Sequence, residues 1–198
     1  MKSFSELIKL NKKIRVLGID DAPFDKEISD SSLDVNIIAT ICSNTRIEGL
    51  LYSAITKDSL DSTEIIIDMI KKSKFFSQLH LIITDGIAVG GFNIIDINKV
   101  YTELNIPCIA VMRKLPNLSK FDKALKNLPN YEKRKELIIS AGEIFEKNGF
   151  IFQVAGENEN DTAVILERIT DQGKVPEALR LSHLIGSAIK TGESSKRA

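Results

Sequence analysis

This chain of 198 residues lacks several features that would place a protein in a class at once. Its two cysteines, Cys42 and Cys108, have no metal-type spacing and lie in apolar runs, so we expect two buried, reduced thiols. No apolar run reaches the roughly 18–20 residues that a membrane-spanning helix needs. The N-terminal segment has no apolar core of a secretory signal, and we therefore expect a cytoplasmic protein without a membrane partner.

The chain also lacks net charge, because 27 basic residues balance 27 acidic ones. That balance argues against a protein held to nucleic acid by bulk charge. The charges are unevenly distributed, however, and residues 113–135 form a strongly basic stretch. This stretch has two interpretations, which are a nucleic-acid-binding surface that includes Lys120, Lys123 and Lys126, or the solvated face of a helix.

No internal repeat or long linker divides the sequence, and its length predicts a single domain over residues 1–198. Alternation with a period of two predicts strands, the second and third joined as a hairpin at Asn44-Thr45. Strands that alternate with helices follow, so the order predicts an α/β fold with a mixed sheet. The expected strands are 14–19, 34–43, 46–56, 79–84, 107–112 and 149–154, and the expected helices are 62–73, 92–104, 120–148 with an interruption at Pro129, 161–170 and 176–190.

Two of the expected strands end in aspartates. The first, in RVLGIDDAPF, delivers Asp20-Asp21, and LHLIIT is followed by Asp85-Gly86. If these strands are neighbours, the carboxylates meet at one edge of the sheet, where they repel each other unless a cation lies between them. Each pair alone is also explained as a turn. Together they predict a site for Mg²⁺, which prefers oxygen ligands and takes one or two carboxylates.

Asp61 and Glu64 are two more acidic candidates, and either one could supply a third metal ligand. Their spacing also fits a capping box at the start of a helix, with Asp61 as the N-cap and Glu64 three residues later. Both interpretations stay open from the sequence.

Four segments in combination resemble the endonuclease dU family, which is related to endonuclease V. The resemblance extends from about residue 15 to residue 198 and implies a ribonuclease H-like fold, with a mixed sheet of five to six strands flanked by helices. It also implies a DNA-repair endonuclease that uses Mg²⁺, or Mn²⁺ in its place, to cleave DNA that contains deoxyuridine, with DNA or RNA as the partner. The segments are VLGIDDAPF, LIITDGIAVGGFNIIDI, IPCIAVMRK and VPEALRLSHLIGSAIKTGESSKRA.

The resemblance assigns roles residue by residue. Asp20 and Asp85 match the metal-binding aspartates of endonuclease V, and Asp21 adjoins the first of them. Arg113 takes the place of a lysine that follows the strand IPxIxV, with Lys114 next to it. The resemblance therefore implies that a basic residue here binds a phosphate or stabilises the charge that develops during cleavage.

The chain departs from endonuclease V at three points. The histidine of its V-S-x-G-H segment aligns with VAGEN, where Glu157 follows Gly156, and its proline-tyrosine wedge has no counterpart. The loop after Asp85-Gly86 is apolar, and we expect Gly90 and Gly91 to offer backbone amides to a base. Phe92 either stacks on the base or packs inward as the first core residue of its helix. This drier pocket predicts cleavage at uracil over hypoxanthine. The missing histidine favours the alternative function, a catalytically inactive nucleic-acid-binding relative.

The chain has only two histidines. His183 lies among apolar residues at helical spacing, which is typical of a packed or hydrogen-bonded core histidine, and a catalytic role is the alternative. Arg180, three residues earlier, is available to a carboxylate or phosphate. His80 alternates with leucines on an expected central strand, which indicates a structural role.

Overall fold

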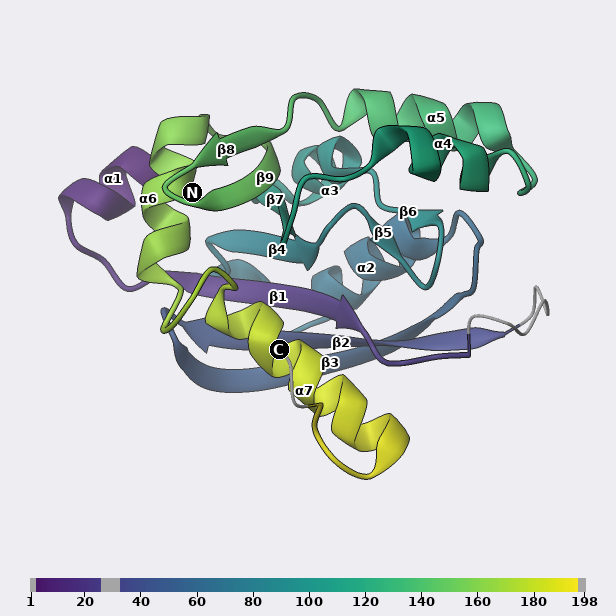
Figure 1. Cartoon of the computed structure of the whole chain (residues 1–198). Helices are drawn as coiled ribbons and strands as arrows, with labels where there is room; N and C mark the ends of the chain where they lie inside the picture. Colours follow the sequence, from purple (N-terminus) through teal and green to yellow (C-terminus); the bar gives the residue numbers. More distant parts are fainter. Residues whose placement is uncertain (1–2, 26–32, 196–198) are drawn as a thin grey trace.

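The computed structural model describes residues 3–25 and 33–195. A seven-stranded sheet of order β3-β2-β1-β4-β7-β9-β8 forms the middle layer (Figure 1). β1, β4 and β7 are parallel in its centre, and antiparallel pairs extend it on both sides. The strands are β1 (Arg15–Asp21), β2 (Asp34–Ser43), β3 (Arg46–Thr56), β4 (Leu81–Asp85), β7 (Cys108–Met112), β8 (Phe145–Lys147) and β9 (Phe150–Ala155), with a separate pair of β5 (Ala88–Val89) and β6 (Asn93–Ile94).

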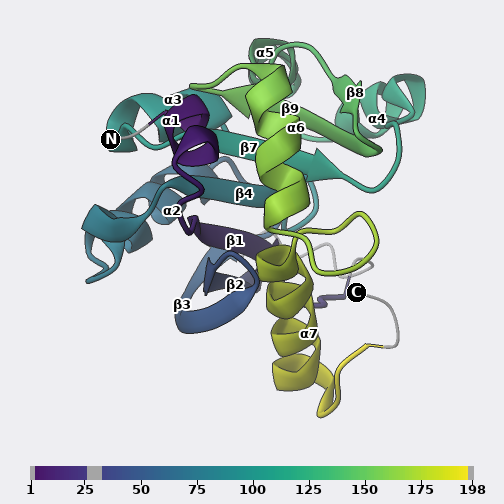
Figure 2. The same cartoon turned by 90° about the vertical axis from the view of Figure 1, so that its left-hand side faces the viewer.

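Helices cover both faces of this sheet. They are α1 (Phe4–Lys9), α2 (Ser62–Lys71), α3 (Ile97–Leu104), α4 (Leu118–Leu125), α5 (Tyr131–Ser140), α6 (Glu159–Arg168) and α7 (Glu177–Thr191), with one 3₁₀ turn, η1 (Phe76–Gln78). α6 and α7 lie on the same face, as the rotated view makes plain (Figure 2). Among the helices of residues 3–25 and 33–195, none combines the length and apolar character that a bilayer crossing requires.

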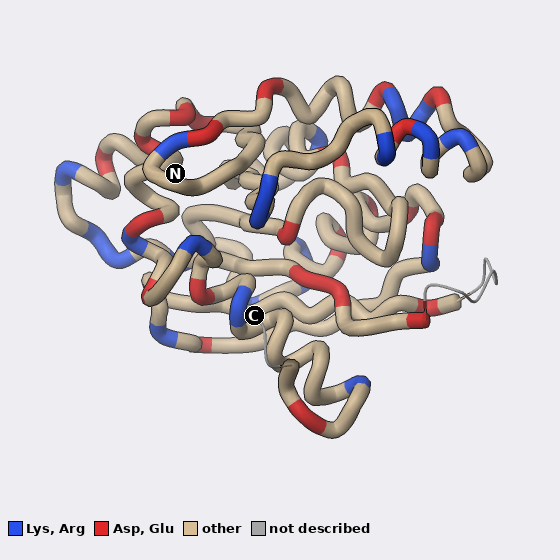
Figure 3. Tube along the Cα trace, viewed as in Figure 1, with Lys and Arg blue, Asp and Glu red and all other residues tan. Residues whose placement is uncertain are grey.

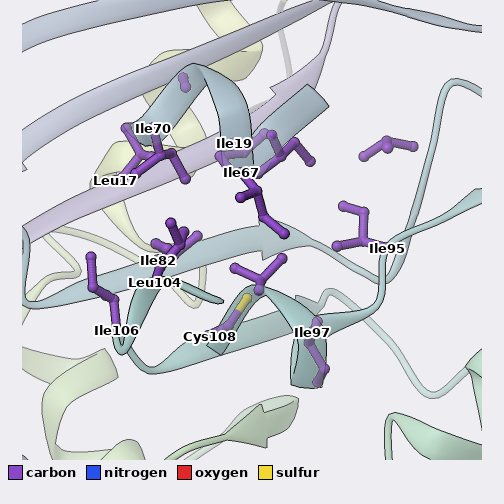
Figure 4. Close-up of a cluster of buried hydrophobic side chains, with 14 of the residues drawn as sticks. Leu17, Ile19, Ile67, Ile70, Ile82, Ile95, Ile97, Leu104, Ile106 and Cys108 are labelled. Carbon is purple, nitrogen blue, oxygen red and sulfur yellow. The ribbon is translucent and has the colours of Figure 1, made fainter. Parts of the chain in front are cut away.

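The central strands divide their side chains between two cores. On β1, Val16 packs into the cluster that includes residues of α1, α6 and α7, whereas Leu17 packs into the cluster with residues of α2 and α3. Successive strand residues point to opposite faces, so a strand covered on both sides must be apolar throughout. Ile82, Leu104 and Cys108 lie with Leu17 in the second of these cores (Figure 4).

The fold confirms the predicted α/β class with a mixed sheet flanked by helices, with seven strands in place of five or six. The hairpin at Asn44-Thr45 is confirmed, and Asn44 adopts the positive φ of 54° that such a turn favours. Cys42 and Cys108 are buried free thiols, as expected. Five short elements escaped prediction, namely α1, η1, β5, β6 and β8.

Two predicted boundaries were wrong. The helix expected from residue 92 begins at Ile97, because Asp96 is its N-cap and accepts a hydrogen bond from the Lys99 amide at 2.9 Å. The stretch 120–148 is helical on both sides of the predicted interruption at Pro129, in α4 and α5, but α5 ends at Ser140 and the strand β8 follows. Asp61 is the N-cap of α2, as one interpretation predicted, but its side chain makes no capping hydrogen bond, so the capping box does not form.

Candidate active site

The two aspartate-ended strands are neighbours. β1 and β4 run parallel with Ile19 opposite Thr84, so Asp20 and Asp85 leave the sheet at the same edge. A cavity of about 460 Å³ opens there, and its lining includes both carboxylates together with Arg113 and His183. The topology therefore brings together the residues that the sequence placed at the ends of separate strands.

The two carboxylates form a like-charged pair in a poorly solvated place. Asp20 is only 5% exposed. Burial raises the pKa of Asp85 above its ordinary value, and the negative charge of Asp20 raises that pKa further, while Arg113 and His183 oppose the rise. The Arg113 guanidinium lies 3.6 Å from an Asp85 oxygen, a long contact that compensates the pair only in part. Such a pair favours an additional cation.

His183 enters the site from α7. Its Nδ1 lies 3.0 Å from Asp20 Oδ2, and this hydrogen bond raises the pKa of the imidazole above its ordinary value. The Asp20 carboxylate also accepts the amide N–H of Asp21 at 2.9 Å through its other oxygen. Asp20 is thus held in one orientation by two contacts from different elements.

The position of α7 depends on a glycine of β1. A side chain on Gly18 would bring its Cβ within 2.5 Å of the Ala178 backbone, so only glycine permits α7 to approach this closely. Ser182, next to His183, fastens the contact by donating to the Gly18 carbonyl at 2.8 Å and accepting from the Thr40 amide at 3.0 Å. The helix that supplies the imidazole is therefore anchored one residue away from it.

Asp21 fixes the loop between β4 and α3. Its Oδ2 accepts the Gly90 amide at 2.6 Å, which removes that amide from the donors that the sequence offered to a base. The next loop residues are held by Asp58, whose Oδ1 accepts the Phe92 amide at 2.8 Å. Gly91 lines the active-site cavity at a φ of 90°, and a Cβ there would lie 2.3 Å from Asp58.

Phe92 packs inward. Its ring lies 5.2 Å, centroid to centroid, from that of Phe121 on α4, and Arg134 donates to its carbonyl. Arg134 is 1% exposed and also donates to the carbonyls of Ser59 and Pro129, at 3.0 Å and 3.1 Å. This arginine belongs to the basic stretch 113–135, but its charge binds α5 to the loops below it and is unavailable to a partner.

The structure does not bring Asp61 or Glu64 to the cavity. Asp61 accepts hydrogen bonds from the Thr56 amide at 3.2 Å and from the Asn93 side chain at 2.6 Å, and so joins β3 to β6. Glu64 is exposed and pairs with Lys99 on α3. Both carboxylates have structural partners, and neither residue is among those that line the cavity.

The three lysines predicted to bind nucleic acid lie on or at the end of α4. Lys120 and Lys123 are exposed, and Lys126 is an exposed partner of Asp122 at 3.1 Å. Basic and acidic residues are interspersed along α4 and α5 (Figure 3). Lys114 is exposed beside Arg113, and it is not among the residues that line the cavity.

The donor set at the cavity fits a magnesium ion. Within the part of the chain that the structure describes, no three His, Cys, Asp or Glu side chains form a ready-made metal cluster. The cavity instead is lined by Asp20, which His183 orients, by Asp85, and by Asp21, one of whose oxygens accepts the Gly90 amide. Mg²⁺ commonly takes one or two carboxylates and completes its shell with waters and substrate phosphate, so two carboxylates suffice.

Sequence reasoning gave His183 only a secondary chance of a catalytic role and looked for the missing histidine near Glu157. Glu157 follows β9, whose residue Ala155 pairs with Cys108 at the start of β7, and it accepts the Phe4 amide at 2.8 Å. It therefore lies at the opposite edge of the sheet from Asp85. Arg180, the other candidate on α7, pairs with Glu177 at 2.6 Å. The available signal for His183 was its place in the PEALRLSH segment that carried the resemblance.

Comparisons with known proteins agree with this architecture. The family described as endonuclease dU matches residues 12–190. A UPF0215 protein of Archaeoglobus fulgidus is 38% identical over 187 residues, which cover 94% of this chain and 99% of the relative. A second, from Methanosarcina barkeri, is 40% identical over 194 residues, with coverages of 96% and 97%.

Solved structures extend the likeness of fold. The crystal structure of a protein of unknown function from Archaeoglobus fulgidus matches with a TM-score of 0.83 at 38% identity, over 89% of this chain and 98% of that one. Human endonuclease V matches with a TM-score of 0.60 at 10% identity, over 94% and 88%. Endonuclease V of Ciona intestinalis, solved with a DNA that contains an inosine, matches at 0.56 and 11%, over 87% and 84%.

Proposed function

The chain belongs to the endonuclease dU family, and from that premise we propose that it is a metal-dependent endonuclease that cleaves DNA containing deoxyuridine. Family and fold together support a nuclease related to endonuclease V. The observation that carries the proposal is the pair Asp20 and Asp85 in one cavity, with the pKa of Asp85 raised by burial and by the charge of Asp20.

Four residues of the cavity have roles in this proposal. Asp20 and Asp85 would hold Mg²⁺, or Mn²⁺ in its place, and His183 keeps the Asp20 carboxylate in its orientation. Bound there, the ion would supply Lewis-acid chemistry for phosphodiester hydrolysis, which is a lowered pKa of water and stabilisation of the charge on the leaving oxygen. Arg113 faces the same cavity and binds a phosphate of the substrate. Lys114 beside it adds positive charge next to the DNA strand.

Deoxyuridine is a chemically reasonable target for such a site. Deamination of cytosine leaves a U·G mismatch, and extrusion of a base from a mismatch costs less than extrusion from a matched pair. We therefore expect the protein to cleave DNA at uracil in preference to hypoxanthine. We also expect this cleavage to be a step in DNA repair. The alternative function is nucleic-acid binding without catalysis, which is favoured by the engagement of Asp61 and Glu64 in structural contacts.

The test compares labelled duplexes that differ in one base. Duplexes with deoxyuridine, deoxyinosine or only ordinary bases are incubated with the purified protein in Mg²⁺, in Mn²⁺ and in EDTA. We expect strand cleavage of the deoxyuridine duplex in either metal and none in EDTA. The Asp20→Asn variant, purified in parallel, identifies cleavage by a contaminating nuclease. Lesion binding without cleavage in either metal would establish the alternative, and faster cleavage at hypoxanthine would refute the base preference.

A further inference from the structure

A second cavity adjoins the candidate active site. It measures about 380 Å³ and lies between the segment after β4, the end of β7, and helices α4 and α5. Ala88 lines both cavities. Gly86 and Met112 line the second one, and each is the direct chain neighbour of an active-site residue, Asp85 or Arg113. The two cavities are therefore neighbours that meet at Ala88.

The walls of this second cavity are apolar. Phe121 and Ile144 belong to its lining, and Leu118 and Ile139 stand at it with 58% and 68% of their surface exposed. Exposed large apolar groups around a hollow are typical of a binding site. The volume lies in the range of roughly 300–1,000 Å³ in which small-ligand pockets fall, and such pockets are mostly apolar with few polar groups.

One buried polar side chain faces this apolar space. Gln153 of β9 is 4% exposed and lines the cavity. Its Nε2 donates to the Gly142 carbonyl at 2.8 Å, which fixes the orientation of the amide. Its Oε1 has no hydrogen bond to any residue that the structure describes. This oxygen is also not among the fully buried atoms without a partner, so it is accessible from the cavity. The cavity thus presents one hydrogen-bond acceptor that cannot turn into a donor.

A fixed acceptor distinguishes uracil and hypoxanthine from cytosine and adenine, the bases from which deamination produces them. Cytosine has a ring nitrogen with a lone pair at N3, whereas uracil has an N–H there, and the same change occurs at N1 when adenine becomes hypoxanthine. A hydrogen-bond acceptor in the protein pairs with the N–H of the deaminated base. The parent base instead presents a lone pair, and the acceptor is then left without a hydrogen bond. Thymine has the same N–H as uracil, so its exclusion depends on the 5-methyl group and on the cost of extrusion from a matched pair.

We infer that the extruded base of the substrate enters this second cavity and that Gln153 selects it through the N–H created by deamination. The inference rests on the proposed function, since it assumes that the scissile phosphate lies at Asp20 and Asp85. It places the base on the α4 side of the 86–92 segment. The amide of Gly90, offered to the base by the sequence, already donates to Asp21, and Phe92 packs on Phe121. Gln153 is a specificity residue and stays outside the metal site.

Binding in EDTA tests the inference separately from cleavage. Fluorescence anisotropy compares a duplex that carries a U·G mismatch with the same duplex that carries a tetrahydrofuran abasic analogue at the uracil position. We expect the wild-type protein to prefer the uracil duplex. Gln153→Met keeps the side-chain volume and removes the acceptor, and it should weaken uracil binding about tenfold, as loss of one buried hydrogen bond does, with abasic binding unchanged.

Two further variants protect the test against misfolding. Ile144→Trp fills the cavity and should produce the same selective loss for the uracil duplex. Gln172→Met makes the same substitution at an exposed loop position and should leave both affinities unchanged. A cooperative thermal transition in each variant establishes that the chain is folded.

The outcomes separate the two proposals. If the wild type binds uracil no better than the abasic analogue, or if Gln153→Met keeps the wild-type ratio, the cavity does not bind the base. If the ratio changes as expected and no duplex is cleaved in Mg²⁺, the proposed function fails and the base cavity stands. If uracil DNA is cleaved while the ratio is insensitive to Gln153, the function stands and the base lies elsewhere.

Discussion

The two ends of β1 both have a cavity and a nearby histidine, but they differ in how their charges are compensated. Each has a cavity, of about 570 Å³ at the Arg15 end and about 460 Å³ at the Asp20 end, and each has one of the two histidines. At the first end, the Arg15 guanidinium pairs with Glu48 at 2.6 Å, and the His80 ring accepts the Arg15 amide at 3.0 Å. At the second end, Asp20, Asp21 and Asp85 line the cavity, and burial together with the charge of Asp20 raises the pKa of Asp85.

The difference shows why cavity volume alone does not mark a functional site. The Arg15 end satisfies its charges internally, since Arg15 also donates to the Gln78 side chain and the His80 amide donates to the Arg15 carbonyl at 2.9 Å. The Asp20 end leaves negative charge only partly compensated in a place where burial makes it costly. Where the end of a sheet has only a structural role, its charges are paired and this free-energy cost is small. Where it binds a cation, the uncompensated negative charge is what attracts the ion.

The largest expected effect separates the two ends by catalysis. Asp85→Asn removes one of the carboxylates proposed to hold the metal, and cleavage of the deoxyuridine duplex in Mg²⁺ should fall by at least about 10³-fold, as when a stabiliser of the transition state is removed. Glu48→Gln, the matched change at the Arg15 end, should leave the rate unaltered. Single-turnover rates measure both. Wild-type turnover by Asp85→Asn would show that this carboxylate is not part of the catalytic site.

The second prediction exchanges the two histidines. His183→Ala removes the partner that orients Asp20 and should lower the cleavage rate about 10–100-fold, the usual cost of losing the orienting partner of a ligand. His80→Ala should instead lower the free energy of unfolding by about 1 kcal/mol, because the Arg15 amide loses its acceptor. Kinetics and denaturant unfolding are measured on both variants. A loss of stability without a loss of rate in His183→Ala would make it a core histidine after all.

The third prediction concerns the approach of DNA to one end of the sheet. Affinity should fall as salt rises, and neutralising Lys120, Lys123 and Lys126 to Gln should flatten that dependence by about 0.9 in logarithmic slope per lost phosphate contact. Lys9, Lys12 and Lys13, which precede β1 at the Arg15 end, are the matched control set and should leave the slope unchanged. Titrations over a range of salt concentrations decide it. Equal slopes in both triple variants would place the DNA on another surface.

The smallest effect is the pH dependence of stability without metal. The pKa of Asp85 is raised in the folded state, so its contribution to stability is fully present below the ordinary carboxyl value of 3.8 and is lost as pH rises through the folded value. In EDTA, Asp85→Asn should therefore gain stability relative to the wild type as pH increases from about 3.5 to about 7. Glu48→Gln removes an ion pair and should lose a little at neutral pH. Thermal unfolding at several pH values measures both, and a Tm difference between Asp85→Asn and the wild type that does not change with pH would contradict it.

Part of the site was predictable because it follows from strand order. Asp20 and Asp85 end strands that read as apolar runs, and parallel neighbours bring their carboxyl ends to one edge. The hairpin at Asn44-Thr45 and the burial of Cys42 and Cys108 follow from local period and composition. Asp61 was not predictable in this way, because a carboxylate beside a helix start serves equally as a cap, a ligand or, as found here, a bridge between β3 and β6.

The sequence by itself determined the mixed α/β fold and the aspartates at the ends of two strands, since hydrophobic period and chain order are local properties, whereas the pairing of these strands is a tertiary contact. Only the tertiary structure decided that His183 bonds to Asp20, because α7 reaches β1 through the close approach that Gly18 permits, 160 residues earlier in the chain than Ala178. It also decided that the Gly90 amide donates to Asp21 and that Gln153 lines a cavity beside the site. Contacts between distant segments depend on packing geometry, and no local pattern of residues encodes the choice of partner.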